Sequence, residues 1–259
     1  MLLPGLSFNP VPLGYGPLVP ATMANIDIPN SGGNYLSRSS ALNGLSDGKQ
    51  GTLSFWFTLD ESDSGGRTIF EVNSGSSQRF AADRSVSLAN NKFYITIRDS
   101  GGTDRMRVYT SSSISDPRGW THIMASWDVT TSGRRHLYVN GTSNITQDAF
   151  SNATLYYQGS NIRMGNGSSS DANPLGGKIG DFFFHPQYLD LSLSANRAKF
   201  YQSGQPVWLG FEGERIFGSQ AIWYMSGFDG EYAINKGSGG SFATVGSIGS
   251  GDSGLNYVV

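Results

Sequence analysis

The chain has no cysteine among its 259 residues. Disulfide bridges and thiolate metal sites are therefore excluded, because both need the cysteine sulfur. Large extracellular animal domains often contain a bridge, so this absence is compatible with folding in a reducing cytosol. The first five residues also lack a basic stretch and a sustained apolar run, and we expect neither a signal peptide nor a membrane-spanning segment.

Charged residues are scarce as well, at 15% of the chain, and the formal net charge is only −2. Binding to nucleic acid or acidic lipid through overall charge needs a strongly basic balance, so we expect neither partner. Glycine, in contrast, is abundant, with 35 residues. Many glycines and few charges favour short strands joined by tight turns, and argue against a helical bundle, a coiled coil or a disordered chain.

Residues 1–33 contain six of the ten prolines. Proline fixes φ and removes a backbone donor, so this segment is predicted to be an extended arm rather than a helix or a central strand. Because the arm is too apolar for a solvated linker, we expect it to pack against its own domain or a neighbouring protein. The side chains predicted to anchor it to a partner are Leu2, Leu3, Leu6, Phe8, Leu13 and Tyr15.

Apolar and polar residues alternate in a series of short segments after the arm. In the first of them Leu53, Phe55 and Phe57 fall on one face and Trp56 on the other. Such alternation is typical of antiparallel strands with one wet face, and two such sheets packed together form a sandwich. The predicted strands are residues 52–59, 68–72, 93–98, 105–110, 120–127, 135–139, 161–165 and 178–185.

Two segments near the C-terminus differ from this pattern. Residues 190–202 have a helical pattern, which Ser192 or Ser194 can cap and Gly204 ends. Residues 203–259 are rich in Gly and Ser, with aromatic islands, and predict either further edge strands or an appendage that faces a partner.

The most informative stretch is residues 120–141, where two predicted strands flank a Thr-Ser-Gly turn and Asn140-Gly141 closes the second strand. Its order of Trp, His, Asp, a Gly turn and Leu-Tyr-Val-Asn-Gly resembles the central hairpin of laminin-G-like domains, which belong to the concanavalin A-like lectin and glucanase group. Residues 35–38, 52–57 and 176–182 follow the same order. The resemblance implies an all-β fold, an antiparallel jelly-roll β-sandwich over residues 34–202, with residues 203–259 as a C-terminal extension.

The C-terminal motifs are similar to a tail found on laminin-G-like proteins of tailed bacteriophages. They comprise residues 206–210, 222–227, 235–242 and 245–248. This resemblance implies a non-enzymatic virion structural protein, assembled in the bacterial cytoplasm and present in several copies. Its partners would be other virion proteins of the capsid or tail. It would be tail-associated or otherwise surface-exposed and could contact host glycan. A capsid decoration protein is nearly as well supported.

An enzyme of this fold would need paired carboxylates on one strand, in an E-x-D-x-E type of run. Such a run is absent, and the nearest sequence, Glu212-Gly213-Glu214, is better explained as two solvated loop charges. We expect His122 to be structural, while His136 and His185 lack the spacing of a zinc site. A glycan-active enzyme is therefore an unfavoured alternative. A free lectin is another, against which the apolar arm argues.

Two kinds of binding residue remain as candidates. Trp56, Tyr94, Tyr109 and Phe183 point away from the predicted core and can stack on sugar rings, or they can pack against the arm, the tail or the second sheet. Calcium is left open as a cofactor, with Asp99, Asp104 and Asp171 as candidate ligands in two loops. Because calcium needs six to eight oxygens, ordinary turn hydrogen bonding is the stronger interpretation of these aspartates.

Overall fold

The computed structural model describes residues 20, 22–60, 65–75, 79–85, 91–114, 118–167, 173–226, 231 and 233–259. All six predicted anchoring side chains of the arm (Leu2, Leu3, Leu6, Phe8, Leu13 and Tyr15) lie outside the described residues, so that prediction stands as made. Within the described part, no helix is both long and apolar enough to cross a bilayer.

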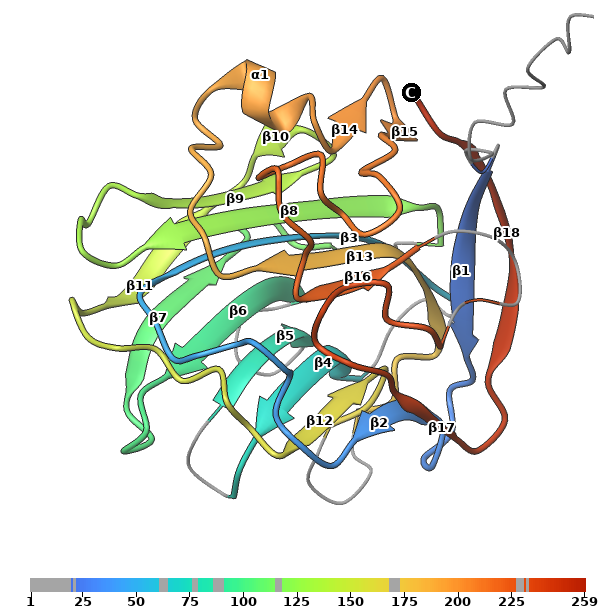
Figure 1. Ribbon diagram of the computed structural model, residues 1–259, viewed down its shortest axis with the longest axis horizontal. Coiled ribbons are helices and arrows are strands. Elements are labelled where there is room, and N and C mark those ends of the chain that lie inside the picture. The colour runs from blue at the N-terminus through green and yellow to red at the C-terminus, as the bar shows by residue number, and fades with distance from the viewer. Residues whose placement is uncertain are drawn as a thin grey trace, which may run out of the picture.

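Two large antiparallel sheets face each other across a common core (Figure 1). Sheet A has the strand order β10-β9-β8-β3-β13-β1-β18, and β16 also pairs with β13. Its strands are β1 (Thr22–Ile28), β3 (Gln50–Leu59), β8 (Thr121–Asp128), β9 (Arg135–Val139), β10 (Thr142–Ser143), β13 (Gly177–His185), β16 (Trp223–Met225) and β18 (Gly249–Asn256).

Sheet B has the order β11-β7-β6-β5-β4-β12-β2-β17. Its strands are β2 (Tyr35–Arg38), β4 (Arg67–Asn73), β5 (Arg79–Ser85), β6 (Lys92–Arg98), β7 (Asp104–Tyr109), β11 (Thr146–Phe150), β12 (Asn161–Met164) and β17 (Ala243–Val245). The all-β sandwich predicted from the sequence is thus confirmed.

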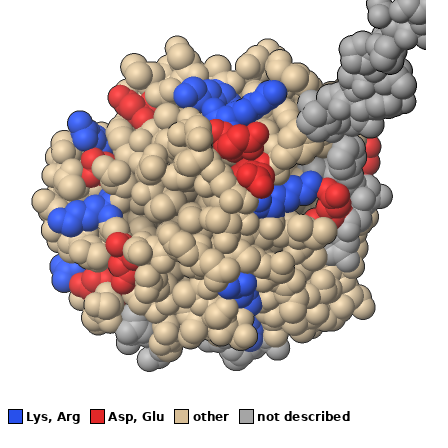
Figure 2. Space-filling view, viewed as in Figure 1, with Lys and Arg blue, Asp and Glu red and all other residues tan. Residues whose placement is uncertain are grey.

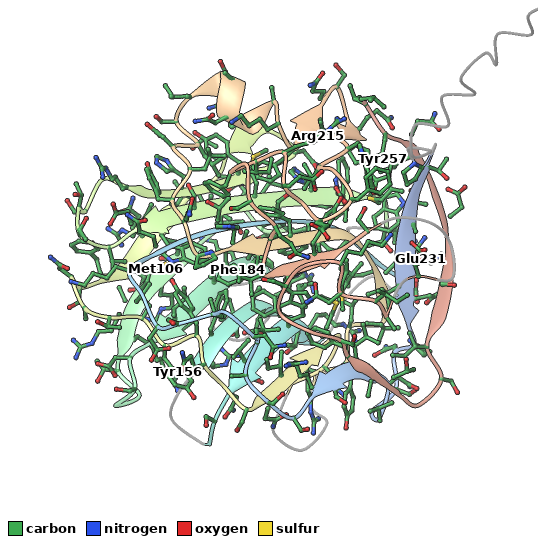
Figure 3. The ribbon with its side chains drawn as sticks, viewed as in Figure 1. Met106, Tyr156, Phe184, Arg215, Glu231 and Tyr257 are labelled. Carbon is green, nitrogen blue, oxygen red and sulfur yellow. The ribbon has the colours of Figure 1, made fainter. Side chains whose placement is uncertain are left out.

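Alternation along the strands builds the core between the sheets. On β6, Phe93, Ile95 and Ile97 are fully buried, and they meet the equally buried Phe55 and Phe182 of sheet A. Phe55 lies 5.7 Å from Phe93 and 5.8 Å from Phe182, measured between ring centroids. Met106 and Phe184, labelled in Figure 3, belong to the same buried cluster. The opposite residues of β6 therefore point away from the core, onto the outer face of sheet B.

The hairpin of β8 and β9 forms as predicted, with Ile123 opposite Val139 and Trp127 opposite Arg135. Asn140 and Gly141 turn the chain with φ values of 48° and 75°. Both lie in the left-handed region, which Gly and Asn adopt at low cost. The turn thus uses the two residues that the sequence offers for it.

Strands of both sheets lie on either side of the predicted domain boundaries at residues 33/34 and 202/203. β1 lies within the predicted arm, yet it pairs with β13 and β18 in sheet A. The predicted extension supplies β16 and β18 to sheet A and β17 to sheet B. The reason is that β13 offers a free edge that strands from both ends of the chain complete. The sandwich therefore extends from residue 22 to residue 256.

The predicted helix at residues 190–202 is much shorter in the structure. Only α1 (Ser194–Arg197) is helical, and β14 (Tyr201–Gln202) then pairs with β15 (Gln205–Pro206). Leu191 and Phe200 are buried against the outer face of sheet A, so packing fixes the turns on either side of α1. This segment forms a third layer above sheet A (Figure 1).

Candidate functional site

A hollow of about 310 Å³ lies on the outer face of sheet B, at strands β5, β6, β7 and β11. We call it the sheet B groove. Its volume is at the lower end of the range for small-ligand pockets. The groove is lined by two tyrosines, four cationic side chains, two carboxylates and a threonine: Tyr94, Tyr109, Arg79, Lys92, Arg98, Arg107, Asp104, Asp148 and Thr96.

Tyr94 and Tyr109 are directly opposite each other on β6 and β7. Side chains at opposed positions lie about 5 Å apart at Cβ, so the two phenol rings share one part of the groove. Both are half-buried, which leaves ring surface for a ligand. The ammonium of Lys92 lies 5.2 Å from the centroid of the Tyr109 ring. These groups combine an apolar surface with a positive charge beside it.

The other part of the groove is a network of ion pairs. Asp104 accepts from Arg98 Nε at 2.8 Å and from Arg107 at 2.7 Å. Arg107 also donates from Nε to Asp148 at 2.5 Å, which joins β7 to β11. A register irregularity between Ile97 and Arg98 brings Arg98 opposite Asp104. The network offers both N–H donors and carboxylate acceptors in fixed positions.

Arg79 enters the groove from β5 and is held from below by two buried carboxylates. Glu71 accepts from Arg79 Nε at 2.9 Å, and Asp83 accepts from the guanidinium at 2.5 Å. Burial works to lower the pKa of Arg79, but Asp83 and Glu71 outweigh it and the pKa is raised. Burial also raises the pKa of Asp83, against the opposing effect of Arg79. Arg79 is therefore charged and fixed in orientation.

Sequence reasoning missed this pair of carboxylates. Glu71 and Asp83 lie on neighbouring strands, so they do not form an E-x-D-x-E run in the sequence. In addition, β5 itself was not predicted. Neither lines the groove, and each is less than a tenth exposed. They hold Arg79 in place rather than face a ligand.

Of the four predicted glycan-contact residues, the structure brings Tyr94 and Tyr109 together in the groove. For Trp56 and Phe183 the structure corrects the expectation of glycan contact, because the two residues are only 1% and 0% exposed. Trp56 stacks on Tyr201 at 5.6 Å, and Phe183 packs on Phe200 at 5.5 Å between centroids. Both point away from the core between the sheets, as predicted, but the third layer above sheet A covers them.

Asp99 and Asp104, the two candidate calcium ligands that the structure describes, are engaged in separate sets of hydrogen bonds. Asp99 accepts from the backbone N–H of Gly101 and Thr103 and from Arg105 Nε, and the Thr103 bond is the largest cause of its lowered pKa. Asp104 belongs to the groove network, and Asp171 lies outside the described residues. Among the described residues there is no group of three or more His, Cys, Asp or Glu suited to a metal. Calcium binding stays a prediction.

His122 has the structural role expected of it. It is fully buried, and its Nε2 lies 2.8 Å from Ser54 Oγ. Burial lowers the pKa of His122 to about 3, so the ring is neutral at ordinary pH. His136 instead contacts the hydroxyl of Tyr188 at 2.8 Å, on the other sheet from the groove.

The paired sheets and a polar, tyrosine-lined groove define a β-sandwich of the lectin-like type. The chain belongs to the concanavalin A-like lectin/glucanases superfamily, whose family model matches residues 30–191. The resemblance to laminin-G-like domains is thereby confirmed. No curated protein matches the sequence.

Two solved structures illustrate how far the fold is shared. A "putative carbohydrate binding protein" from Bacteroides ovatus has 11% identity and a TM-score of 0.60, over 92% of this chain and 62% of that one. The heptameric SAP-like pentraxin of Limulus polyphemus has 13% identity and a TM-score of 0.51, over 82% of this chain and 98% of that one. At these identities the similarity establishes the fold alone.

Proposed function

We propose that this protein binds glycan in the sheet B groove and carries out no catalysis there. The observation that supports this most is the pairing of Tyr94 with Tyr109 beside a network of fixed donors and acceptors. A sugar ring has an apolar C–H face, which suits a phenol ring, and a hydroxyl rim, which suits arginine and carboxylate groups. The lectin-like fold and the description of the Bacteroides ovatus protein agree with this proposal.

Replacement of the tyrosines tests the proposal. Tyr94→Ala and Tyr109→Ala remove the ring surface, and we expect each to weaken glycan binding by about tenfold, equivalent to about 1.4 kcal/mol. Affinity is measured by calorimetry on the strongest ligands from a glycan array. Tyr35→Ala is the matched control, since Tyr35 lies on β2 in the same sheet but outside the groove lining. Equal affinity of all three variants and the parent would contradict the proposal.

The absence of catalysis is proposed because the carboxylates at the groove are engaged with arginine. Asp104 is paired with Arg98 and Arg107, and Asp148 with Arg107. A glycosidase needs one carboxylic acid to donate a proton and a second carboxylate to act as base or nucleophile. Prolonged incubation with the bound glycan should release no new reducing ends, and their appearance would overturn this part of the proposal.

We also propose the virion role that the C-terminal motifs predict, in which the groove would bind glycan from the surface of a phage particle. The protein would be a structural component of a tailed phage particle, on the tail or as a capsid decoration. Labelled antibody on intact particles tests this: label on the tail or head supports one of the two locations, and unlabelled particles contradict both.

A further inference from the structure

The charges of the sheet B groove are matched except at one position. Arg79 is paired with Glu71 and Asp83, and Arg98 and Arg107 are paired with Asp104 and Asp148. Among the lining cations, only Lys92 has no carboxylate partner within the described residues. Its ammonium instead makes a cation–π contact with the Tyr109 ring. A ligand can therefore reach the Lys92 ammonium without breaking an existing ion pair.

Lys92 also lies where a stacked sugar would present its substituents. It is two residues before Tyr94 on β6, so both side chains point to the same outer face of sheet B. Its ammonium is 5.2 Å from the centroid of the Tyr109 ring. A sugar lying on the tyrosines thus places a substituent at its edge close to this charge, whereas the opposite edge meets the Asp104 and Asp148 network.

We propose that the glycan bound in the groove is acidic. Its apolar ring face lies on Tyr94 and Tyr109, and its carboxylate or sulfate group accepts hydrogen bonds from the Lys92 ammonium. This inference rests on the proposed glycan binding and adds the chemical class of the ligand. The anion supplies the partner that Lys92 lacks, and charge-assisted hydrogen bonds of this kind are stronger than neutral ones.

The experiment uses the full chain and pairs of probes that differ only in charge. The panel comprises 3′-sialyllactose with lactose, trigalacturonate with its carboxyl-reduced form, and a sulfated disaccharide with its desulfated form. Each is titrated against the parent, Lys92→Gln and Lys199→Gln. Lys199→Gln removes the same charge from the segment that covers sheet A and is the matched control. Circular dichroism confirms that all three proteins are folded.

We expect the parent to prefer the acidic member of at least one pair. Lys92→Gln should lose about tenfold in affinity for that member and little for its neutral counterpart, while Lys199→Gln matches the parent. The preference should also weaken with added salt, because the pair is partly exposed. The carboxylated and sulfated pairs show which anion the groove accepts.

Three other results are informative. Preference for neutral sugars, with Tyr94→Ala still harmful, overturns the acidic ligand and leaves the glycan site intact. Acidic preference that Lys92→Gln does not change overturns the role given to Lys92. No binding by any probe, in the panel or on a full glycan array, overturns the proposed function itself, together with this inference.

Discussion

Asp181 has an environment very different from that of an ordinary surface carboxylate. It lies at a bulge of β13, with φ of 46°, and is 3% exposed. The Tyr257 hydroxyl donates to its Oδ1 at 3.2 Å and lies 2.5 Å from Ser226 Oγ. Tyr257, labelled in Figure 3, thus connects the C-terminus to the interior. Burial raises the pKa of Asp181 to about 7, against the smaller effects of Ser226, Tyr257 and Tyr224.

The raised pKa of Asp181 predicts how stability depends on pH. The folded state binds this proton more tightly than the unfolded state, whose pKa is 3.8. The resulting stabilisation is complete below pH 3.8 and is lost as the pH rises toward 7. Asp181→Asn lacks this loss, so its free energy of unfolding relative to the parent should rise by up to about 4 kcal/mol between pH 4 and pH 8.

Urea unfolding at one-unit pH steps measures this difference. Comparison of the two proteins at the same pH also cancels the contribution of His122 to the stability difference. The lowered pKa of His122 makes both proteins lose stability as the pH falls below 6.5, the ordinary pKa of histidine. Asp27→Asn, at an exposed carboxylate of β1, is the control and should run parallel to the parent. A parallel curve for Asp181→Asn as well would show that Asp181 is not a buried acid.

At the level of single residues, the sequence predicted part of the groove. Alternation along residues 93–98 and 105–110 placed Tyr94 and Tyr109 outward, because Phe93, Ile95 and Val108 are apolar enough to define the inner face. The same logic failed for Trp56 and Phe183, since sheet A is covered on both faces and alternation cannot distinguish solvent from a second core. Arg79 with Glu71 and Asp83 was missed because β4 and β5 had to be paired in register before these contacts could be predicted.

At the level of elements, the segment with α1, β14 and β15 determines which aromatic residues of sheet A can reach a ligand. Phe183, Phe200, Leu209 and Tyr224 form a second buried cluster on the outer side of this sheet. Trp56, Trp208 and Tyr257 form a third beside it. The segment is therefore part of the folded unit and not a loose appendage.

Phe200→Ala tests whether this third layer is a true core. The side chain is 1% exposed and packs on Phe183, so its removal leaves a cavity and should cost about 3–5 kcal/mol of unfolding free energy. Leu193→Ala is the control in the same segment, because Leu193 is 55% exposed, and its cost should stay within about 0.5 kcal/mol. Equal, small losses in urea unfolding for both variants would mean that the layer packs only loosely.

Strand prediction succeeded or failed according to composition. β3, β6, β8 and β13 are rich in aromatic and branched residues, and each was placed to within two residues. β18, with the sequence GSGDSGLN, has little intrinsic strand propensity and was not recognised. It forms because β1 presents an unpaired edge to it, which is a tertiary cause that local sequence does not reveal.

At the level of the whole molecule, the two sheets have different surroundings. Sheet A lies between the main core and the segment with α1, β14 and β15 (Figure 1). The outer face of sheet B instead keeps half-exposed tyrosine, arginine and lysine side chains around a hollow. The groove is therefore on the side of the sandwich opposite the third layer.

Charge on the molecule is sparse and locally balanced. On the face shown in Figure 2, most Lys and Arg lie beside Asp and Glu in small groups, and wide uncharged areas separate these groups. With a formal net charge of −2, long-range attraction contributes little to binding an acidic ligand. The proposed recognition of an acidic glycan would thus depend on short-range contacts, above all those of Lys92 and the two tyrosines.

The decisive measurement is a crystal structure of the full chain with the acidic saccharide that binds most tightly in the panel. We predict density for a sugar ring on Tyr94 and Tyr109, with its anionic group within hydrogen-bond distance of Lys92 Nζ. A sugar bound elsewhere, for example in the hollow lined by Trp120, Lys178 and Asp252, with the sheet B groove empty, would contradict glycan recognition by this face.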